Sequence, residues 1–268
     1  MQLIAHLSDV HFGRIAHAGI VEDLVQEVND AAVDLVIVSG DLTQRALPRQ
    51  FEAARAMLDA FTAPVVVVAG NHDVYAWWHQ PFFRMVSPLR RYKQYISPKL
   101  TQTFSRDGLA VLGINSAFGL TVKGGYISPG VESDIDTYFG TPDVETFKIL
   151  VVHHHLTRID ALGRHDIAWN AKRTLDTALR NDVDLVLCGH LHISHVECME
   201  RHNGHLPLVI ASAGTATSDR GRKEHHDANF YNQITVEQEM FSIEERRYVP
   251  AERRFIEHRR SQFARVRA

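Results

Sequence analysis

Hydrophobic and polar positions along the chain follow two periods, one typical of buried strands and one typical of amphipathic helices. Short apolar runs at residues 3–9 (LIAHLSD), 34–41 (DLVIVSGD) and 65–73 (VVVVAGNHD) predict strands. Between these runs, apolar residues recur at helical spacing over residues 20–28 and 51–61. This β-α-β-α-β order predicts a parallel sheet whose strands are buried on both faces, because each crossover packs a helix against the sheet.

The second half of the chain continues the same alternation. A helix is predicted over residues 170–182, where apolar positions again recur at helical spacing. Further strands are predicted at residues 109–116, 149–155, 183–190, 206–214 and 230–237. The sequence contains no internal repeat and no Pro/Gly/Ser-rich linker, so we expect a single α/β domain over residues 1–250.

One aromatic segment, residues 75–100, interrupts this pattern. Its rings are Trp77, Trp78, Phe82, Phe83, Tyr92 and Tyr95. We expect a helical insertion, and two interpretations stay open: the rings are core that covers the sheet, or they form the wall of a binding cleft.

The C-terminal segment, residues 251–268, is rich in arginine. Glutamate residues are interspersed among the arginines, a pattern typical of a solvated tail or a surface helix rather than of a dedicated binding site. We therefore assign this tail no function.

Composition narrows the class of protein. The 268 residues are 45% hydrophobic and 23% charged, as in ordinary globular proteins, and no apolar run is long enough to span a bilayer. The N-terminus has no pattern of a secretory signal, and Cys188 and Cys198 are expected to be reduced thiols. We expect a cytoplasmic protein with no disulfide framework. A net charge of −3 gives no global reason to expect a nucleic-acid partner or an anionic membrane.

Polar residues gather where the predicted strands end. They are Asp9 and His11, Asp41, Asn71 with His72 and Asp73, the triplet His153 to His155, and His190 with His192. Each group alone is more often a polar surface turn than a pair of ligands. Because the carboxyl ends of neighbouring strands in an α/β sheet face one crevice, we expect these groups to converge there.

The types of these side chains predict a metal site. Carboxylate, imidazole and amide oxygen without thiolate suit Mn²⁺, Fe or Zn²⁺. The set is too large for one catalytic ion with an open position, and it suits two ions about 3.5 to 4 Å apart that share a bridging carboxylate. With Asp9, Asp41 and a bridging hydroxide, two divalent ions leave a net charge of about +1, which attracts an anionic phosphate ester.

The motifs that contain these residues resemble those of a known family. They are Asp9-x-His11, Gly40-Asp41, Gly70-Asn71-His72-Asp73, a histidine after a hydrophobic strand, and Gly189-His190-x-His192. Together they resemble the calcineurin-like metallophosphoesterase superfamily, and most of all the bacterial class III cyclic-nucleotide phosphodiesterases and related glycerophosphodiesterases. The resemblance implies a four-layer α/β/β/α sandwich with a dimetal site at the strand ends.

The resemblance also implies how the ligands are shared. It assigns Asp9, His11 and His192 to one ion, Asn71, His153 and His190 to the other, and Asp41 to both as the bridge. In relatives, the histidine of the Gly-Asn-His motif lies over the phosphate. His72 is therefore expected to stabilise the transition state or protonate the leaving group, with Asp73 orienting the ring and raising its pKa.

Two positions leave alternatives open. Relatives often continue from the strand-end histidine into His-Pro, whereas this chain has His154, His155 and Leu156. We choose His153 as the ligand and keep His154 as the alternative. The later stretch that begins at Ala211 is similar to the strand that follows the metal motifs in the cyclic-nucleotide phosphodiesterase branch. Two interpretations stay open for it: Arg220 or Arg222 reaches a phosphate, or both arginines lie in a solvated surface loop.

The expected activity is hydrolysis of a phosphodiester by attack of a metal-bridging hydroxide. Cyclic nucleotides, glycerophosphodiesters and related diesters are all open as small-molecule substrates. The alternatives are a phosphomonoesterase or a nuclease on the same fold, of which the nuclease requires an extended basic groove that the weak net charge disfavours. A binding protein that has lost catalysis is a further alternative, but decayed ligands would then be expected. The sequence leaves the oligomeric state open.

Overall fold

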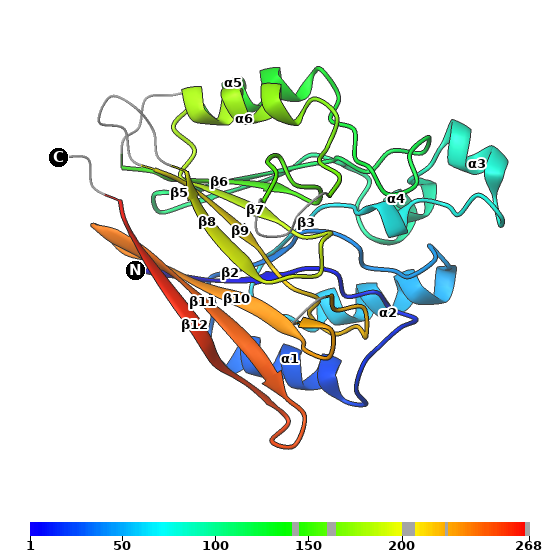
Figure 1. The fold of residues 1–268 in the computed structure, drawn as a ribbon, viewed down its shortest axis with the longest axis horizontal. Helices are drawn as coiled ribbons and strands as arrows, with labels where there is room; N and C mark the ends of the chain where they lie inside the picture. The colour runs from blue at the N-terminus through cyan, green and yellow to red at the C-terminus, as the bar shows by residue number, and fades with distance from the viewer. Residues whose placement is uncertain (141–144, 160–164, 200–206, 223–224, 266–268) are drawn as a thin grey trace.

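Two mixed sheets face each other at the centre of the computed structural model (Figure 1). The structure describes all residues except 141–144, 160–164, 200–206, 223–224 and 266–268. In these described residues the first sheet has the order β12-β11-β10-β1-β2-β3 and the second β4-β5-β6-β7-β9-β8. The first consists of β12 (Arg254–Ala264), β11 (Met240–Val249), β10 (Phe230–Val236), β1 (Gln2–Leu7), β2 (Leu35–Val38) and β3 (Val65–Val67). The second consists of β4 (Gln102–Arg106), β5 (Leu109–Ile114), β6 (Phe147–Val152), β7 (Leu185–Cys188), β9 (Leu208–Ser212) and β8 (His195–Met199).

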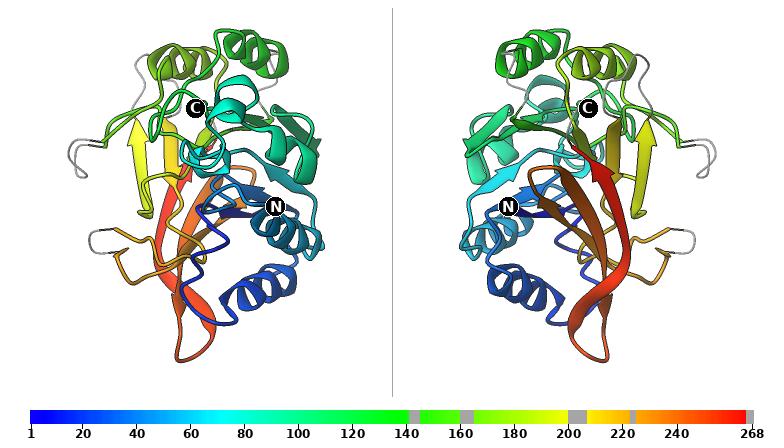
Figure 2. Two further views of the ribbon diagram at one scale, coloured as in Figure 1. Left: turned by 90° about the vertical axis from the view of Figure 1, so that its right-hand side faces the viewer. Right: turned by 90° about the vertical axis from the view of Figure 1, so that its left-hand side faces the viewer.

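Helices cover the outer face of each sheet, as Figures 1 and 2 show. The helices are α1 (Ile20–Asp30), α2 (Pro48–Asp59), α3 (Pro81–Val86), α4 (Arg90–Tyr95), α5 (Val131–Phe139) and α6 (Ala171–Arg180), with a 3-10 turn at Asn71–Asp73. Leu24 of α1 and Phe51 of α2 are fully buried in one core with residues of the first sheet. Helices α5 and α6 pack in a second core with residues of β5, β6 and β7.

A third core lies between the sheets. Ile4 and Ile37 of the first sheet share it with Val151 and Leu187 of the second, and all four are fully buried. Alternate residues of the central strands point to opposite faces, so each of these strands contributes to two cores. Each such buried side chain contributes about 1.5 to 3 kcal/mol. The expected α/β/β/α sandwich is confirmed.

Parallel strands bring the polar strand ends together. Strands β1, β2 and β3 are parallel neighbours in one sheet, and β5, β6, β7 and β9 are parallel neighbours in the other. The predicted parallel arrangement is therefore confirmed for these strands. The carboxyl ends of both sets lie on the same side of the molecule (Figure 1). The strand predicted from residue 206 is β9, and residue 206 itself lies outside the described residues.

The arginine-rich C-terminal segment differs from its prediction. Residues Arg254–Ala264 form β12, which pairs with β11 as an antiparallel edge strand. The segment is mostly exposed, as expected, but it is an edge strand and not a tail or a surface helix, because its charged side chains pair across the hairpin and with α1. Arg260 forms an ion pair with Glu244 of β11, and Arg253 lies 2.8 Å from Asp23 of α1. Residues 266–268 lie outside the described residues.

The aromatic segment contains both α3 and α4, as expected of a helical insertion. Tyr92 is fully buried in the core beneath the first sheet, and its hydroxyl donates to the carbonyl of Val67 at 3.0 Å. Trp77 and Trp78, by contrast, line a cleft. Tyr92 therefore belongs to the core, and the role of Trp77 and Trp78 as the wall of a binding cleft stays a prediction. Among the described residues, no helix is long and apolar enough to cross a membrane.

Candidate metal centre

The turns after β1 and β2 run side by side and place two carboxylates together. The backbone N–H of Asp9 donates to Gly40 O at 3.1 Å, and that of His11 donates to Asp41 O at 2.9 Å. Gly40 has φ 103°, and a Cβ added there would lie 2.6 Å from Nδ1 of His153. Glycine at this position thus permits both the left-handed turn and the close approach of the histidine from the other sheet.

The first cluster consists of Asp9, His11, Asp41 and His192, all buried. Their candidate ligand atoms all lie within 4.8 Å of one another. His192 Nε2 is 3.2 Å from Asp9 Oδ1, and His11 Nε2 is 3.6 Å from both Asp9 Oδ1 and Asp41 Oδ2. Three of these side chains follow strands of the first sheet, and His192 follows β7 of the second.

The second cluster lies on the other side of Asp41. His153 Nε2 is 3.4 Å from Asp41 Oδ2 and 3.2 Å from Asn71 Oδ1. His190 Nδ1 is 3.0 Å from the same Asn71 oxygen. The structure therefore brings all seven sequence-predicted ligands together, and Asp41 Oδ2 faces both histidine sets, as a bridging carboxylate requires.

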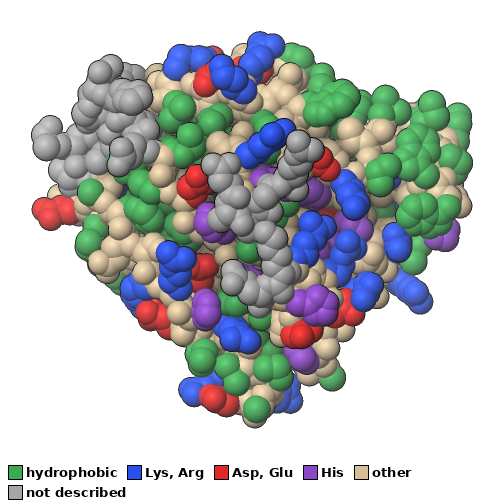
Figure 3. Space-filling view, viewed as in Figure 1, with side chains coloured by type: hydrophobic (Ala, Val, Ile, Leu, Met, Phe, Trp, Pro, Cys, Tyr) green, Lys and Arg blue, Asp and Glu red, His purple; other side chains and the backbone are tan. Residues whose placement is uncertain are grey.

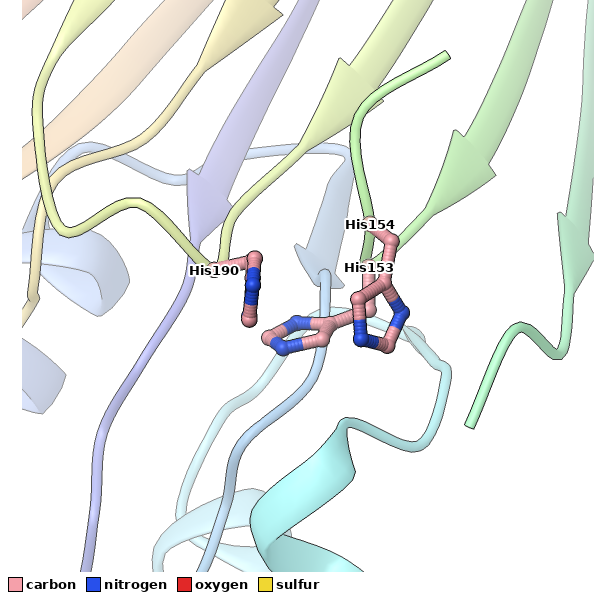
Figure 4. Close-up of side chains that lie close together, drawn as sticks. All are labelled: His153, His154 and His190. Atoms are coloured by element: carbon pink, nitrogen blue, oxygen red, sulfur yellow. The ribbon is translucent and has the colours of Figure 1, made fainter. Parts of the chain in front are cut away.

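Three histidine rings lie close together beyond the ends of β6 and β7 (Figure 4). His154 is part of this group, but both of its nitrogens have protein partners: Nδ1 is 2.7 Å from Ser116 Oγ, and Nε2 is 3.1 Å from Lys123 O. His153 Nδ1 lies 2.7 Å from Ser39 O, and this contact leaves Nε2 facing Asp41 and Asn71, both of them candidate ligands. This geometry favours His153 over the alternative His154 as ligand, because a backbone carbonyl on one ring nitrogen fixes the tautomer that presents the other to a metal.

Among the candidate ligands, two buried carboxylate oxygens have no hydrogen-bond partner in the described structure, namely Asp9 Oδ1 and Asp41 Oδ2. The other oxygen of each is held: Asp9 Oδ2 accepts from His190 N at 2.9 Å, and Asp41 Oδ1 accepts from His72 N at 2.8 Å. Buried carboxylate oxygens left without donors are costly unless a cation compensates them. The donor set and these two oxygens therefore fit a pair of divalent ions.

The ionisation of His190, His192 and Asp41 agrees with this fit. Burial alone would lower the pKa of His153, but Asp41 outweighs it and raises this pKa to about 9, so the His153 ring has to lose a proton when it binds a metal. Burial lowers the pKa of His192 to about 3 and holds that of His190 well below its ordinary value, so both are neutral imidazoles at pH 7. Neutral imidazole is the form that binds a metal. Burial alone would raise the pKa of Asp41, but His153 and His72 outweigh it and hold this pKa well below its usual range. Asp41 is therefore ionised.

Most of the candidate ligands have an unusual backbone conformation. The left-handed φ values are 52° at Asp9, 51° at His11, 54° at Asp41, 69° at His190 and 58° at His192. A left-handed conformation at a residue other than glycine costs of order 1–3 kcal/mol and persists where the surrounding structure enforces it. Such residues concentrate at functional sites, and here they turn consecutive polar side chains of each motif toward the same point.

His72 and Asp73 differ in part from their predicted roles. His72 lines the cleft, and its Nδ1 lies 3.0 Å from the carbonyl of Gln44, which leaves Nε2 available. Burial lowers its pKa to about 4, with Asp41 opposing, so the predicted increase in pKa is wrong for this structure. Asp73 does not orient the ring. Its carboxylate instead accepts the backbone N–H groups of Leu42, Thr43 and Gly70, which ties the two turns together.

A cleft of about 430 Å³ opens beside the centre and is strongly cationic. Its charged lining residues are Arg14, Arg45, Arg84, Lys123, Arg220 and Asp219, and Asp219 forms an ion pair with Arg14 at 2.8 Å. Figure 3 shows Lys and Arg side chains, in blue, gathered around histidines, in purple.

Arg220 donates to Gln44 Oε1 at 3.0 Å, whereas Arg222 is exposed. Sequence reasoning missed Gln44, Arg84 and Lys123, since none lies in a strand-end motif.

Comparison with known proteins agrees with this geometry. The family model for calcineurin-like phosphoesterases matches residues 3–194. A glycerophosphodiester phosphodiesterase GpdQ of Enterobacter lignolyticus is 35% identical over 81 residues, 26% of this chain and 29% of the relative. A probable cyclic nucleotide phosphodiesterase of Synechococcus is 26% identical over 171 residues, 61% of this chain and 60% of the relative. These matches span less than two thirds of either curated relative.

A solved structure shares the fold over the whole chain. The dimetal phosphatase from Danio rerio superposes with a TM-score of 0.68 at 13% identity, covering 99% of each chain. At this identity the similarity demonstrates the fold alone. The family match covers most of the chain and includes all seven candidate ligands. The chain therefore belongs to the calcineurin-like phosphoesterase family.

Proposed function

We propose that this protein is a dimetal phosphohydrolase that cleaves phosphodiesters in the cationic cleft. The observation that carries the proposal is the pair of unpartnered buried oxygens, Asp9 Oδ1 and Asp41 Oδ2, each surrounded by imidazole nitrogens. Asp9, His11 and His192 would hold one ion, Asn71, His153 and His190 the other, and Asp41 both. Two such ions would acidify a water molecule into the nucleophile and neutralise charge on the phosphoryl oxygens.

Side chains of the cleft position the substrate. Arg220 lies beside the cluster and presents a guanidinium to a phosphoryl oxygen, where it can form a charge-assisted hydrogen bond. Lys123 and Arg45 add positive charge along the same cleft. An anionic ester is thereby held with its phosphorus next to the metal ligands.

His72 supplies the proton for the leaving group. Its Nδ1–H donates to Gln44 O, so Nε2 is the nitrogen that exchanges a proton with the cleft. A bound anion favours the imidazolium form and raises the pKa of the ring above its value in the empty cleft. As the bond from phosphorus to the leaving oxygen breaks, the Nε2 proton passes to that oxygen, while water oxygen forms the new bond to phosphorus.

The preference for diesters rests on the apolar wall of the cleft. Trp77 and Trp78 line the cleft together with the cations. A diester has a second organic group that such a wall can bury, whereas a monoester carries an additional charge instead. The two curated relatives named above are both described as phosphodiesterases.

The test compares kcat/KM for a bis-aryl phosphate and the matching aryl phosphate with Mn²⁺-loaded protein. We expect the diester to be preferred, and a strong preference for the monoester would contradict the proposal. Arg220→Met provides a matched comparison. Loss of one cation should reduce kcat/KM by about tenfold or more for both esters, and more for the doubly charged monoester.

A further inference from the structure

An exposed hydrophobic face lies next to the cleft, on α3, on Trp78 just before it and on the loop at residues 118–123. Its side chains are between 59% and 68% exposed. We call this set the apolar face, and it consists of Trp78, Phe82, Met85, Val86, Leu120 and Val122. Hydrophobic side chains, green in Figure 3, gather on the right of the molecule, where Figure 1 places α3. Large exposed apolar patches of this kind mark interaction sites.

Arg84 joins the two parts of the apolar face. Its side chain is only 4% exposed, although α3 itself projects from the body of the protein. The guanidinium donates to the carbonyls of Tyr75 and Thr121, and to that of Gly119 at 2.7 Å. Its Cζ atom also lies 5.3 Å from the centroid of the Trp77 ring. One buried cation therefore holds helix and loop together as a single surface.

The two segments that carry the apolar face contain charges of one sign, and Asp219 in the adjoining cleft is paired with Arg14. Residues 75–100 contain five Lys or Arg residues and no Asp or Glu, and residues 118–126 add Lys123, again without an acidic residue. Arg45 adds a guanidinium 4.9 Å from the Trp78 ring. The whole chain, by contrast, has a net charge of −3, so this concentration of positive charge is local.

We propose that the apolar face docks on an anionic phospholipid surface. Exposed Trp and Phe side chains favour the boundary between headgroups and acyl chains, and adjacent Lys and Arg side chains pair with anionic headgroups. A second copy of this chain fits less well, because a symmetric dimer through this face would bring two cationic surrounds together. The projecting position of α3 lets it enter the interface without burying the rest of the molecule (Figure 1).

The docked orientation places the mouth of the cleft at the lipid surface. Trp78 and Val122 belong both to the apolar face and to the lining of the cleft. If the proposed function holds, an amphiphilic phosphodiester could then enter the cleft directly from the interface. The docking itself depends only on the surface and does not require activity.

The experiment measures co-sedimentation of the full chain with vesicles. We expect binding to mixed phosphatidylcholine–phosphatidylglycerol vesicles, weaker binding to pure phosphatidylcholine, and a decrease as salt increases. The double variant Phe82→Ser/Met85→Ser should lower the partition coefficient by about tenfold or more, since it removes two large apolar side chains. Neither residue lines the cleft, so hydrolysis of a water-soluble substrate should be unchanged.

A matched control uses an exposed apolar residue far from α3. Ile256 on β12 is 38% exposed, and Ile256→Ser should bind vesicles like the unmodified protein. Equal binding by Phe82→Ser/Met85→Ser and the unmodified protein would overturn the proposal, as would no binding to anionic vesicles. A dimer in sedimentation velocity that the double variant abolishes, without vesicle binding, would assign the face to a second copy instead. Binding by a chain inactive on every phosphate ester would support the docking and refute only the proposed function.

Discussion

Replacing His72 with alanine separates proton transfer from metal binding. The backbone N–H of His72, not its ring, donates to Asp41 Oδ1 at 2.8 Å. This contact survives the substitution, so the position of the shared carboxylate should be kept. The ring contact with Gln44 O is lost, and the freed carbonyl lies at the cleft, where water can replace the donor.

The two consequences differ greatly in size. Loss of one hydrogen bond at a partly exposed position costs about 1 kcal/mol of unfolding free energy. Loss of a positioned general acid costs about 10² to 10⁴ in rate, which corresponds to about 2.7 to 5.4 kcal/mol in the activation barrier. His72→Ala should therefore remain folded and lose most of its turnover.

The assay uses a series of diesters whose leaving groups differ in pKa. Metal content after reconstitution should match that of the unmodified protein, and the decrease should occur in kcat. The decrease should be largest for alkoxide leaving groups and small for nitrophenolate, which needs little protonation. Added imidazole should restore part of the activity toward the alkoxide ester. An equal decrease across the series, or the loss of an ion, would show that His72 is not the acid.

Three further predictions concern the neighbouring residues. Asp41→Asn should reduce the occupancy of both ions, whereas His11→Ala should weaken the binding of chiefly one ion. Metal analysis by mass spectrometry would show the difference. One ion per chain with full activity in the unmodified protein would refute the shared-ligand arrangement. In Gly189→Ala, the new Cβ would lie 1.8 Å from Ser8 Oγ, so the free energy of unfolding should fall by about 1–3 kcal/mol in urea titrations, and an unchanged value would contradict the packing. Trp77→Ala should raise KM for a bulky diester more than for a small one, and equal increases would argue against a wall role.

The positions of the strand-end motifs could be predicted because each motif follows an apolar run, and such a run specifies its strand through local sequence alone. An apolar run such as residues 149–152 specifies a buried strand, and parallel topology then determines where His153 lies. What could not be predicted depends on contacts between distant segments. The carbonyls of Ser39 and Gln44 orient His153 and His72, and backbone carbonyls carry no signal in the side-chain sequence.

Asp73 and the C-terminal strand illustrate the same limit. Adjacency in sequence suggested that Asp73 contacts His72, but a tight turn sends neighbouring side chains in different directions. Most side chains of β12 are exposed, so the strand has no apolar alternation that would distinguish it from a charged tail. Its pairing is instead stabilised by the partner strand and by α1, including an ion pair between Arg253 and Asp23 at 2.8 Å.

The candidate centre straddles the two sheets, and this position has a consequence for folding. The first sheet supplies the turns of Asp9, Asp41 and Asn71, and the second supplies those of His153 and His190. Neither half of the sandwich has a complete set of donors for either ion, because every set includes a histidine from the second sheet and Asp41 from the first. If these residues hold two ions, high-affinity coordination would have to await docking of the two layers, and it would then close chain loops as long as that from Asp9 to His192. Metal occupancy would be a late event in folding and a restraint on separation of the layers, since pulling the sheets apart at this end would remove donors from both ions at once.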